Sequence, residues 1–306
     1  MNRSFKGIYA ANIVPLKTDK SIDTKNLVRH IKEISNTKGI RGLLVNGHAG
    51  ENFTLSAHEQ IQVLKIVKDS IENSSLIISG VNFEDPQEAA RVAKEMFENG
   101  ANAILVFPPF SWSQGISSEM IYEHHRIISD HIQGPIFLYQ SSINSGYLSY
   151  KKETLNKLVN LKNVIGIKEG SWDFSSYVEN YKFLKGINEQ FLVMASGDEH
   201  IYPCFKYGSD GTQVSLAAIV PEKIVELIEN IESKNFINAQ ELDKKLLTLA
   251  HSIYGKYPPN FATARIKYCL KVLKKIPVDT MRSSIILDND DKKQLEVSLK
   301  DIGMKF

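Results

Sequence analysis

A lysine at the end of a short apolar run is the residue best suited to covalent chemistry in this sequence. The run Val164, Ile165, Gly166, Ile167 leads into Lys168, directly before Glu169 and Gly170. Such a run has the composition of a strand buried on both faces. Among apolar neighbours an ammonium group loses hydration, so its pKa falls and the free amine can attack a carbonyl carbon. Lys168 is therefore a candidate nucleophile for imine (Schiff-base) formation, although a lysine at a strand end more commonly just reaches solvent.

A tyrosine ends the apolar run that precedes the one carrying the lysine. Tyr139 closes the run at residues 135–139. A phenol can shuttle protons while an imine forms or a carbon–carbon bond breaks. Neighbouring parallel strands lie about 5 Å apart, so a tyrosine on one strand can reach a lysine on the next. A purely structural role is the common alternative for such a tyrosine.

A loop with two glycines follows the second apolar run. We call residues 47–51, with the sequence Gly47, His48, Ala49, Gly50, Glu51, the glycine loop. Its glycines allow backbone N–H groups to point at an anion such as a carboxylate. His48 could carry a proton there, because histidine titrates near neutral pH. A tight turn with an exposed histidine is the competing interpretation, and spacing alone leaves both open.

Eight apolar runs alternate with amphipathic segments along the first three quarters of the chain. The runs lie at residues 7–15, 40–46, 76–81, 103–107, 135–139, 164–168, 191–196 and 211–215. Alternation of strands and helices favours a parallel sheet with right-handed crossovers, and eight such units close into a (β/α)8 TIM barrel. An open doubly wound sheet is the alternative, but no GxGxxG motif follows the first run and no Walker A lysine is present. The predicted fold class is therefore α/β, with a TIM barrel.

The sequence after residue 233 contains no further strand-like run. Helical spacing is found at residues 239–253 and 262–275 and from Asp288 onward. We therefore predict a catalytic barrel over residues 1–233 and a helical region over residues 234–306, here called the C-terminal appendage. The active site of a TIM barrel lies at the carboxyl ends of its strands, which is where Lys168, Tyr139 and the glycine loop would meet.

Composition indicates a globular protein that acts on small molecules. Of 306 residues, 42% are hydrophobic and 24% are charged, with a formal net charge of +2. The lysines are dispersed, so neither a nucleic acid nor a membrane is indicated as a partner. No apolar stretch could span a bilayer and no signal-peptide pattern opens the sequence, which predicts a cytoplasmic location. Cys204 and Cys269 lie far apart without a Cys/His cluster, so neither a disulfide, a metal site nor a cofactor is predicted.

Taken in order, these motifs resemble the dihydrodipicolinate synthase/N-acetylneuraminate lyase family. The likeness rests on the glycine loop, on Tyr139 and on the Ile-Gly-Ile-Lys-Glu sequence at 165–169. Residues 10–15, 196–199 and 208–211 are also similar to the family's opening, seventh and eighth strand regions. The resemblance implies a barrel with C-terminal helices and a homo-oligomer, either a dimer or a tetramer. It further implies class I aldolase chemistry on pyruvate or another 2-oxo acid, without a cofactor.

The resemblance also implies roles for individual residues. Lys168 would form the imine, and Tyr139 would relay protons. Gly47, Ala49 and Gly50 would hold the substrate carboxylate through the backbone amides of the glycine loop. Gln213, in the eighth run, would lie beside the substrate.

The sequence also departs from the family pattern in ways that bear on the substrate. Ala49 replaces a hydroxyl residue, a loss of about 0.5–1.5 kcal/mol in hydrogen bonding. His48 replaces the hydroxyl that relays protons to the tyrosine, and it could take over that relay or act as the acid or base. The synthases carry an arginine for the carboxylate of their second substrate, and this chain offers Asn144 at that substrate-binding position instead. The synthases also have a tyrosine supplied across a dimer interface, where this chain has Pro108, Pro109 and Phe110. We therefore expect a divergent branch that is not a true dihydrodipicolinate synthase.

The leading hypothesis from the sequence is a lyase or aldolase that forms an imine between Lys168 and a 2-oxo acid. A sugar-acid dehydratase that uses the same imine is one alternative. A non-catalytic metabolite-binding barrel is another, in which Ala49 and Asn144 would mark the loss of an ancestral site.

Overall fold

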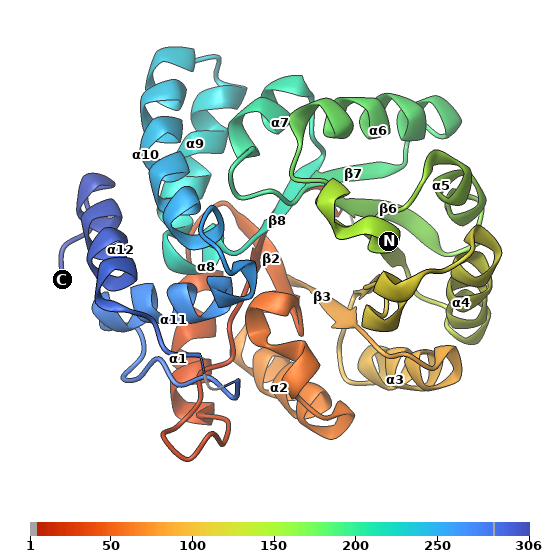
Figure 1. Ribbon diagram of the computed structural model, residues 1–306, viewed down its shortest axis with the longest axis horizontal. Coiled ribbons are helices and arrows are strands. Elements are labelled where there is room, and N and C mark those ends of the chain that lie inside the picture. The colour runs from red at the N-terminus through yellow and green to blue at the C-terminus, as the bar shows by residue number, and fades with distance from the viewer. Residues whose placement is uncertain (1–4, 284) are drawn as a thin grey trace.

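A closed barrel of eight parallel strands forms the centre of the protein (Figure 1). The structure is a computed structural model that describes residues 5–283 and 285–306. Each strand pairs with the next in sequence order, and β8 closes the barrel against β1. The strands are β1 (Gly7–Ala11), β2 (Ile40–Val45), β3 (Leu76–Val81), β4 (Ala103–Val106), β5 (Ile136–Gln140), β6 (Val164–Glu169), β7 (Leu192–Ala195) and β8 (Gly211–Val214). This arrangement confirms the predicted TIM barrel and excludes the open doubly wound sheet.

Helices follow the strands and pack around the outside of the barrel (Figure 1). They are α1 (Thr24–Ser35), α2 (Ala57–Ser70), α3 (Pro86–Glu98), α4 (Ser118–His131), α5 (Lys152–Val159), α6 (Phe174–Ile187), α7 (Ile201–Tyr207), α8 (Leu216–Ile219) and α9 (Pro221–Glu232). Two of their starts follow directly from sequence. Ser56 and Glu59 form a capping box at α2, and Asp85 caps α3 with Pro86 in its first turn.

The first strand is shorter than the apolar run at 7–15 suggests. It ends at Ala11, and Leu16 forms only an isolated bridge with Ile22. The run also includes Pro15, which has no N–H group to donate to a strand ladder, so an apolar composition alone overstates the strand.

The loops at the carboxyl ends of three strands contain short 3-10 helices. These are η1 (His48–Gly50) and η2 (Asn52–Thr54) after β2, η3 (Phe110–Gln114) after β4 and η4 (Ile143–Leu148) after β5. They lie at the end of the barrel where β5 and β6 deliver Tyr139 and Lys168, so this end carries the predicted chemistry.

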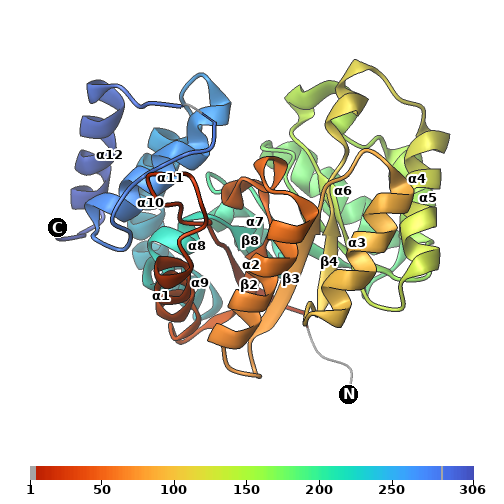
Figure 2. The ribbon, with the colours of Figure 1, turned by 90° about the horizontal axis from the view of Figure 1, so that it is seen from below.

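The C-terminal appendage packs against one side of the barrel, next to α1 and α8 (Figure 2). It contains α10 (Phe236–Tyr254), η5 (Pro259–Phe261), α11 (Ala262–Val272) and α12 (Asn289–Asp301), and the residue 233/234 division falls in the turn between α9 and α10. Its buried side chains, such as Leu249 and Leu299, belong to the same hydrophobic core as the barrel helices. Within the described ranges, no helix combines the length and the apolar character that crossing a membrane requires.

Candidate active site

A cavity of about 450 Å³ opens at the carboxyl ends of the barrel strands. Five of the predicted site residues line it: His48, Ala49, Tyr139, Lys168 and Gln213. Two more, Gly47 and Gly50, are buried in the backbone of the glycine loop that forms one wall. The eighth, Asn144, lies exposed on η4 outside the lining. The structure therefore gathers the predicted nucleophile, phenol and glycine loop around one space.

Lys168 and Tyr139 face each other across neighbouring strands. They are register partners in the β5–β6 ladder, and the Lys168 Nζ atom lies 5.3 Å from the centroid of the Tyr139 ring. Burial lowers the pKa of the Lys168 ammonium to about 8, while the Asp198 carboxylate works against this shift. Roughly one amine in ten is then uncharged at pH 7, a far larger share than for an exposed lysine.

Tyr139 keeps its phenolic proton throughout the physiological range. Burial, with the negative charges of Glu169 and Asp198, raises the pKa of the phenol to about 12. The ring is fixed by packing on Phe107, with 4.8 Å between ring centroids. A held, protonated phenol beside an amine is suited to donating a proton and taking it back.

The glycine loop folds as a single tight turn. The N–H of Gly50 donates to the carbonyl of Gly47 at 2.9 Å, and the N–H of Glu51 donates to the carbonyl of His48 at 3.0 Å. The N–H groups of His48 and Ala49 open the turn and so have no acceptor within it. Backbone donors beside a buried amine are an arrangement that suits a carboxylate.

Both ends of the glycine loop adopt left-handed backbone geometry that is uncommon outside glycine. Asn46 precedes the loop with a φ of 54°, and Glu51 ends it with a φ of 56°. The Asn46 side chain holds its end by donating to the carbonyl of Gln60 and to Ser79 Oγ, each at 3.1 Å. Non-glycine residues in this region persist where surrounding contacts enforce them, commonly at functional sites.

His48 lies in an aromatic stack. Its ring is 4.3 Å from that of Phe107 and 5.8 Å from that of Phe110, and it meets the Tyr139 ring edge-on at 5.7 Å. Burial, helped by the positive charge of Lys168, lowers the pKa of the imidazole to about 3. Its buried Nε2 has no hydrogen-bond partner among the described residues. The ring is therefore neutral at physiological pH, and a role in proton transfer, which the sequence left open, would have to use the neutral form.

Gln213 is fully buried and lines the cavity from β8. Its side-chain nitrogen lies 3.3 Å from Met194 Sδ. Its Oε1 has no hydrogen-bond partner among the residues that the structure describes. A buried amide oxygen without a partner is a ready acceptor for a group on a bound molecule.

Asp198 is a cavity residue that the sequence reasoning did not assign a role. It follows β7 and is 5% exposed, and its Oδ1 accepts a hydrogen bond from the N–H of Leu216 at 2.7 Å. Burial raises the pKa of its carboxyl group to about 7. The available signal was a carboxylate two residues after the apolar run at 191–196, in the segment at 196–199 that resembles the family.

Trp172 and Tyr254 were also missed, and both line the cavity. Their rings lie 4.9 Å apart, and Tyr254 contacts Ser215 through its hydroxyl. Trp172 has a φ of 57°, a third left-handed residue at this site. Tyr254 ends α10 in the C-terminal appendage, so no strand-end pattern could have placed it here.

Known proteins match this chain in sequence over most or all of its length. A model of the dihydrodipicolinate synthetase family matches residues 4–302. The 4-hydroxy-tetrahydrodipicolinate synthase of Prosthecochloris aestuarii is 27% identical over 303 residues, 99% of each chain. That of Methanothrix thermoacetophila is 27% identical over 255 residues, which cover 83% of this chain and 84% of the other.

Solved structures agree in fold. A prophage protein of the dihydrodipicolinic acid synthase family from E. coli K12, solved in complex with pyruvate, superposes with a TM-score of 0.90 at 20% identity, over 98% of this chain and 99% of that one. Dihydrodipicolinate synthase from Thermotoga maritima superposes with a TM-score of 0.88 at 23% identity and the same coverage.

Proposed function

Because this chain belongs to the dihydrodipicolinate synthetase family, we propose that it is a lyase of the aldolase type that forms an imine between Lys168 and pyruvate or another 2-oxo acid. The observation that carries the proposal is the buried Lys168 amine, with a pKa of about 8, beside the Tyr139 phenol in one cavity. The glycine loop in the same cavity wall would receive the carboxylate of the acid.

The first step joins the amine to the ketone carbon. The uncharged Nζ of Lys168 attacks C2 of the 2-oxo acid, and the former carbonyl oxygen takes the proton of the Tyr139 phenol. The nitrogen gives its own proton to the phenolate, which restores Tyr139. Tyr139 then gives its proton to the C2 hydroxyl, which leaves as water, and a protonated imine remains beside the phenolate. Proton transfers of this kind contribute about 10²–10⁴-fold when the groups are held in place.

The imine then serves as an electron sink. The Tyr139 phenolate takes a proton from C3, which gives an enamine and restores the phenol. The enamine can attack the carbonyl carbon of an aldehyde to form a carbon–carbon bond, and the aldehyde oxygen takes the phenolic proton to become a hydroxyl group. Water hydrolyses the new imine and releases the product with the free amine. The same steps in reverse cleave a longer 2-oxo acid into a short one and an aldehyde.

The charges in the cavity bear on the second substrate. Among its described lining residues, Lys168 is the one cationic side chain and Asp198 the one carboxylate. Serine and asparagine side chains also line the cavity, among them Ser141, Ser142, Ser145 and Asn260. An aldehyde with hydroxyl groups suits this surface better than one with a second carboxylate, which would need a cation. The proposal therefore departs from the synthase reaction named for the relatives.

Dehydration of a sugar acid is the second candidate function. Asp198 favours it, because a buried carboxyl group with a pKa of about 7 could protonate a departing hydroxyl at neutral pH. The imine at Lys168 would be common to both reactions.

We also propose that the protein is a cytoplasmic homo-oligomer. Exposed apolar side chains lie on η2, η3 and η4, at the end of the barrel that carries the cavity: Phe53, Phe110, Ile143 and Tyr147. The rings of Phe53 and Phe110 lie 6.2 Å apart, so they form one surface that a second copy could cover. Sedimentation velocity would test this, and a single monomer species at micromolar concentration would contradict it.

Product analysis separates the candidate reactions. The protein is incubated with a panel of hydroxylated 2-oxo acids and sugar acids, and the products are identified by mass spectrometry. Cleavage releases a short 2-oxo acid and an aldehyde, whereas dehydration releases neither. A ligand that raises the melting temperature, with no product and no adduct after borohydride reduction, would instead indicate a binding protein.

A further inference from the structure

Helix α11 of the C-terminal appendage holds the glycine loop from outside the barrel. Two side chains on adjacent turns of this helix reach it. Thr263 Oγ1 donates a hydrogen bond to the carbonyl of His48 at 3.3 Å, and Lys267 forms an ion pair with the Glu51 carboxylate. Lys267 is 0% exposed and Glu51 is 1% exposed. One end of the loop is thus tied to a helix more than 200 residues further along the chain.

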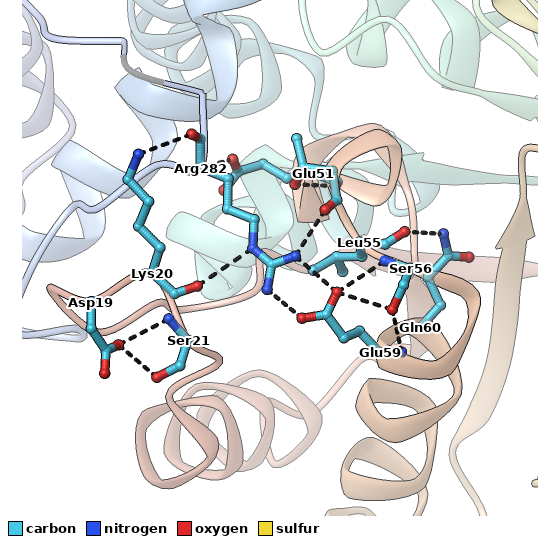
Figure 3. A network of polar contacts seen from close by, with 10 residues as sticks. Asp19, Lys20, Ser21, Glu51, Leu55, Ser56, Glu59, Gln60 and Arg282 are labelled. Atoms are coloured by element: carbon cyan, nitrogen blue, oxygen red, sulfur yellow. Dashed lines mark hydrogen bonds and ion pairs between the residues drawn. The ribbon is translucent and has the colours of Figure 1, made fainter.

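The partners of this ion pair extend it into a second segment of the appendage. Lys267 Nζ also donates to the carbonyl of Thr280 at 3.0 Å, and the N–H of Arg282 donates to Glu51 Oε1 at 3.1 Å. Figure 3 shows Arg282 turning its guanidinium group away from Glu51 towards Glu59 at the start of α2. The same guanidinium group donates to the carbonyl of Thr54 at 2.8 Å. Residues on both sides of η2 are therefore fixed by the appendage.

Stability alone does not account for a carboxylate at position 51. Removing two charges from water costs more free energy than the attraction within most buried ion pairs supplies. Proteins in which apolar residues replace a buried ion pair are often as stable as the original. The left-handed backbone at Glu51 would be relaxed by glycine. Glu51 does not line the cavity, so its carboxylate does not itself contact a molecule bound there. What the pair does fix is the direction in which the chain leaves the glycine loop.

We propose that Lys267 is a positioning residue, which acts through Glu51 to hold the glycine loop in the conformation that receives the carboxylate of the 2-oxo acid. This inference rests on the proposed function, because that function assigns the carboxylate to the N–H groups of His48 and Ala49. Without Lys267, the loop would keep its contacts with Thr263 and with the N–H of Arg282, but the Glu51 carboxylate would lose its charged partner and would no longer hold that end of the loop in one orientation. The expected consequence is weaker binding of the acid, with the chemistry at Lys168 unchanged.

The test measures how borohydride trapping of pyruvate depends on pyruvate concentration. In the full-length Lys267→Met protein, we expect the half-saturating concentration to rise about tenfold or more, because small misplacements of binding groups are costly. The trapping rate at saturation, per folded molecule, should stay within about threefold of wild type. A purely structural role would lower the active fraction and leave the half-saturating concentration unchanged.

Lys271→Met is the matched control. Lys271 lies one turn further along α11 and pairs with Asp279 at 2.8 Å, but both side chains are partly exposed. This variant removes the same charge from the same helix and should leave both trapping parameters unchanged.

Glu51→Gln keeps the test decisive if Lys267→Met does not fold. It should raise the half-saturating concentration in the same way, and the double variant should be no worse than either single one, since both act through one contact. The proposal is overturned if both single variants bind pyruvate within twofold of wild type, or if Lys271→Met shifts binding as much as Lys267→Met. Absence of any adduct in the wild-type protein would instead count against the proposed function.

Discussion

Tyr139 and Lys168 are paired residues in the ladder between β5 and β6, with the lysine amine 5.3 Å from the tyrosine ring centroid. Backbone hydrogen bonds of the barrel set this separation, so it does not depend on the conformation of a loop. Rigid elements of this kind hold catalytic groups more accurately than loops do. The proposed chemistry begins from this pair, and the predictions below address each group around it.

Replacement of Tyr139 by phenylalanine should slow the chemistry without weakening binding. In the Tyr139→Phe protein, the phenylalanine ring can still pack on Phe107, but it has no hydroxyl proton to relay. We expect the rate of imine formation at saturation to fall about 10²–10⁴-fold, with the half-saturating concentration of the 2-oxo acid little changed. Stopped-flow or quenched trapping with pyruvate measures both quantities. Tyr147→Phe is the control, because Tyr147 is exposed on η4 outside the cavity lining, and a loss as large in that variant would contradict the assignment.

Imine formation should increase with pH and level off above about pH 8. The lowered pKa of Lys168 means that the amine is protonated below this value and free above it. Below pH 7 the rate should fall about tenfold for each pH unit. The measurement is the initial trapping rate from pH 5.5 to 10. A rate that is still rising steeply at pH 10 would show an ordinary exposed lysine.

Replacement of Asp198 by asparagine should allow the imine to form at lower pH but should slow catalytic turnover. Its carboxylate favours the charged form of Lys168, so Asp198→Asn should move the pH at which trapping levels off to a lower value. Catalytic turnover, once a substrate is known, should fall about tenfold or more if this carboxyl group moves a proton.

Glu199→Gln is the matched control for the Asp198 variant. The neighbouring Glu199 carboxylate contacts His251 at 3.2 Å and does not line the cavity. An equal shift of the trapping profile in both variants would mean that general surface charge, and not Asp198, acts on the lysine.

His48 should behave as a neutral aromatic wall. Because the pKa of its imidazole is about 3, His48→Phe should keep the shape of the pH profile between pH 5.5 and 8. We expect the trapping rate to change by less than about tenfold, since the new ring can still stack on Phe107 and Phe110. Loss of a titration step near pH 6 or 7 in this variant would show that His48 is a working acid or base.

Much of this site follows from the sequence because a barrel fixes where strand ends meet. The apolar run before Lys168 and the run that ends at Tyr139 place both residues at the same end of adjacent strands. The two glycines at 47 and 50 likewise predict a tight turn at that end. These inferences need only the periodicity of the chain and the rule that parallel strands end together.

Other features depend on contacts between segments far apart in the sequence, and the spacing of residues along the chain does not predict such contacts. The low pKa of His48 results from burial, to which the Phe107 and Phe110 rings after β4 contribute, and from the positive charge of Lys168. Tyr254 and Lys267 reach the site from the C-terminal appendage. Asn144 was predicted beside the substrate, yet it lies exposed on η4, where its neighbours Ser142 and Ser145 face the cavity instead. Within a 3-10 helix the direction of each side chain depends on local turn geometry, and that geometry is not evident from the sequence.

The most direct measurement is site-mapped borohydride trapping with pyruvate. Wild-type protein is incubated with pyruvate and borohydride at pH 8, and the reduced adduct is located by peptide mass spectrometry, with Lys168→Met treated in parallel. We predict one adduct per chain on Lys168 and none in the variant, which should remain folded because a neutral side chain replaces a poorly hydrated ammonium group. An adduct on another lysine, or no adduct with pyruvate and with a panel of other 2-oxo acids, would contradict the assignment of Lys168 as the nucleophile.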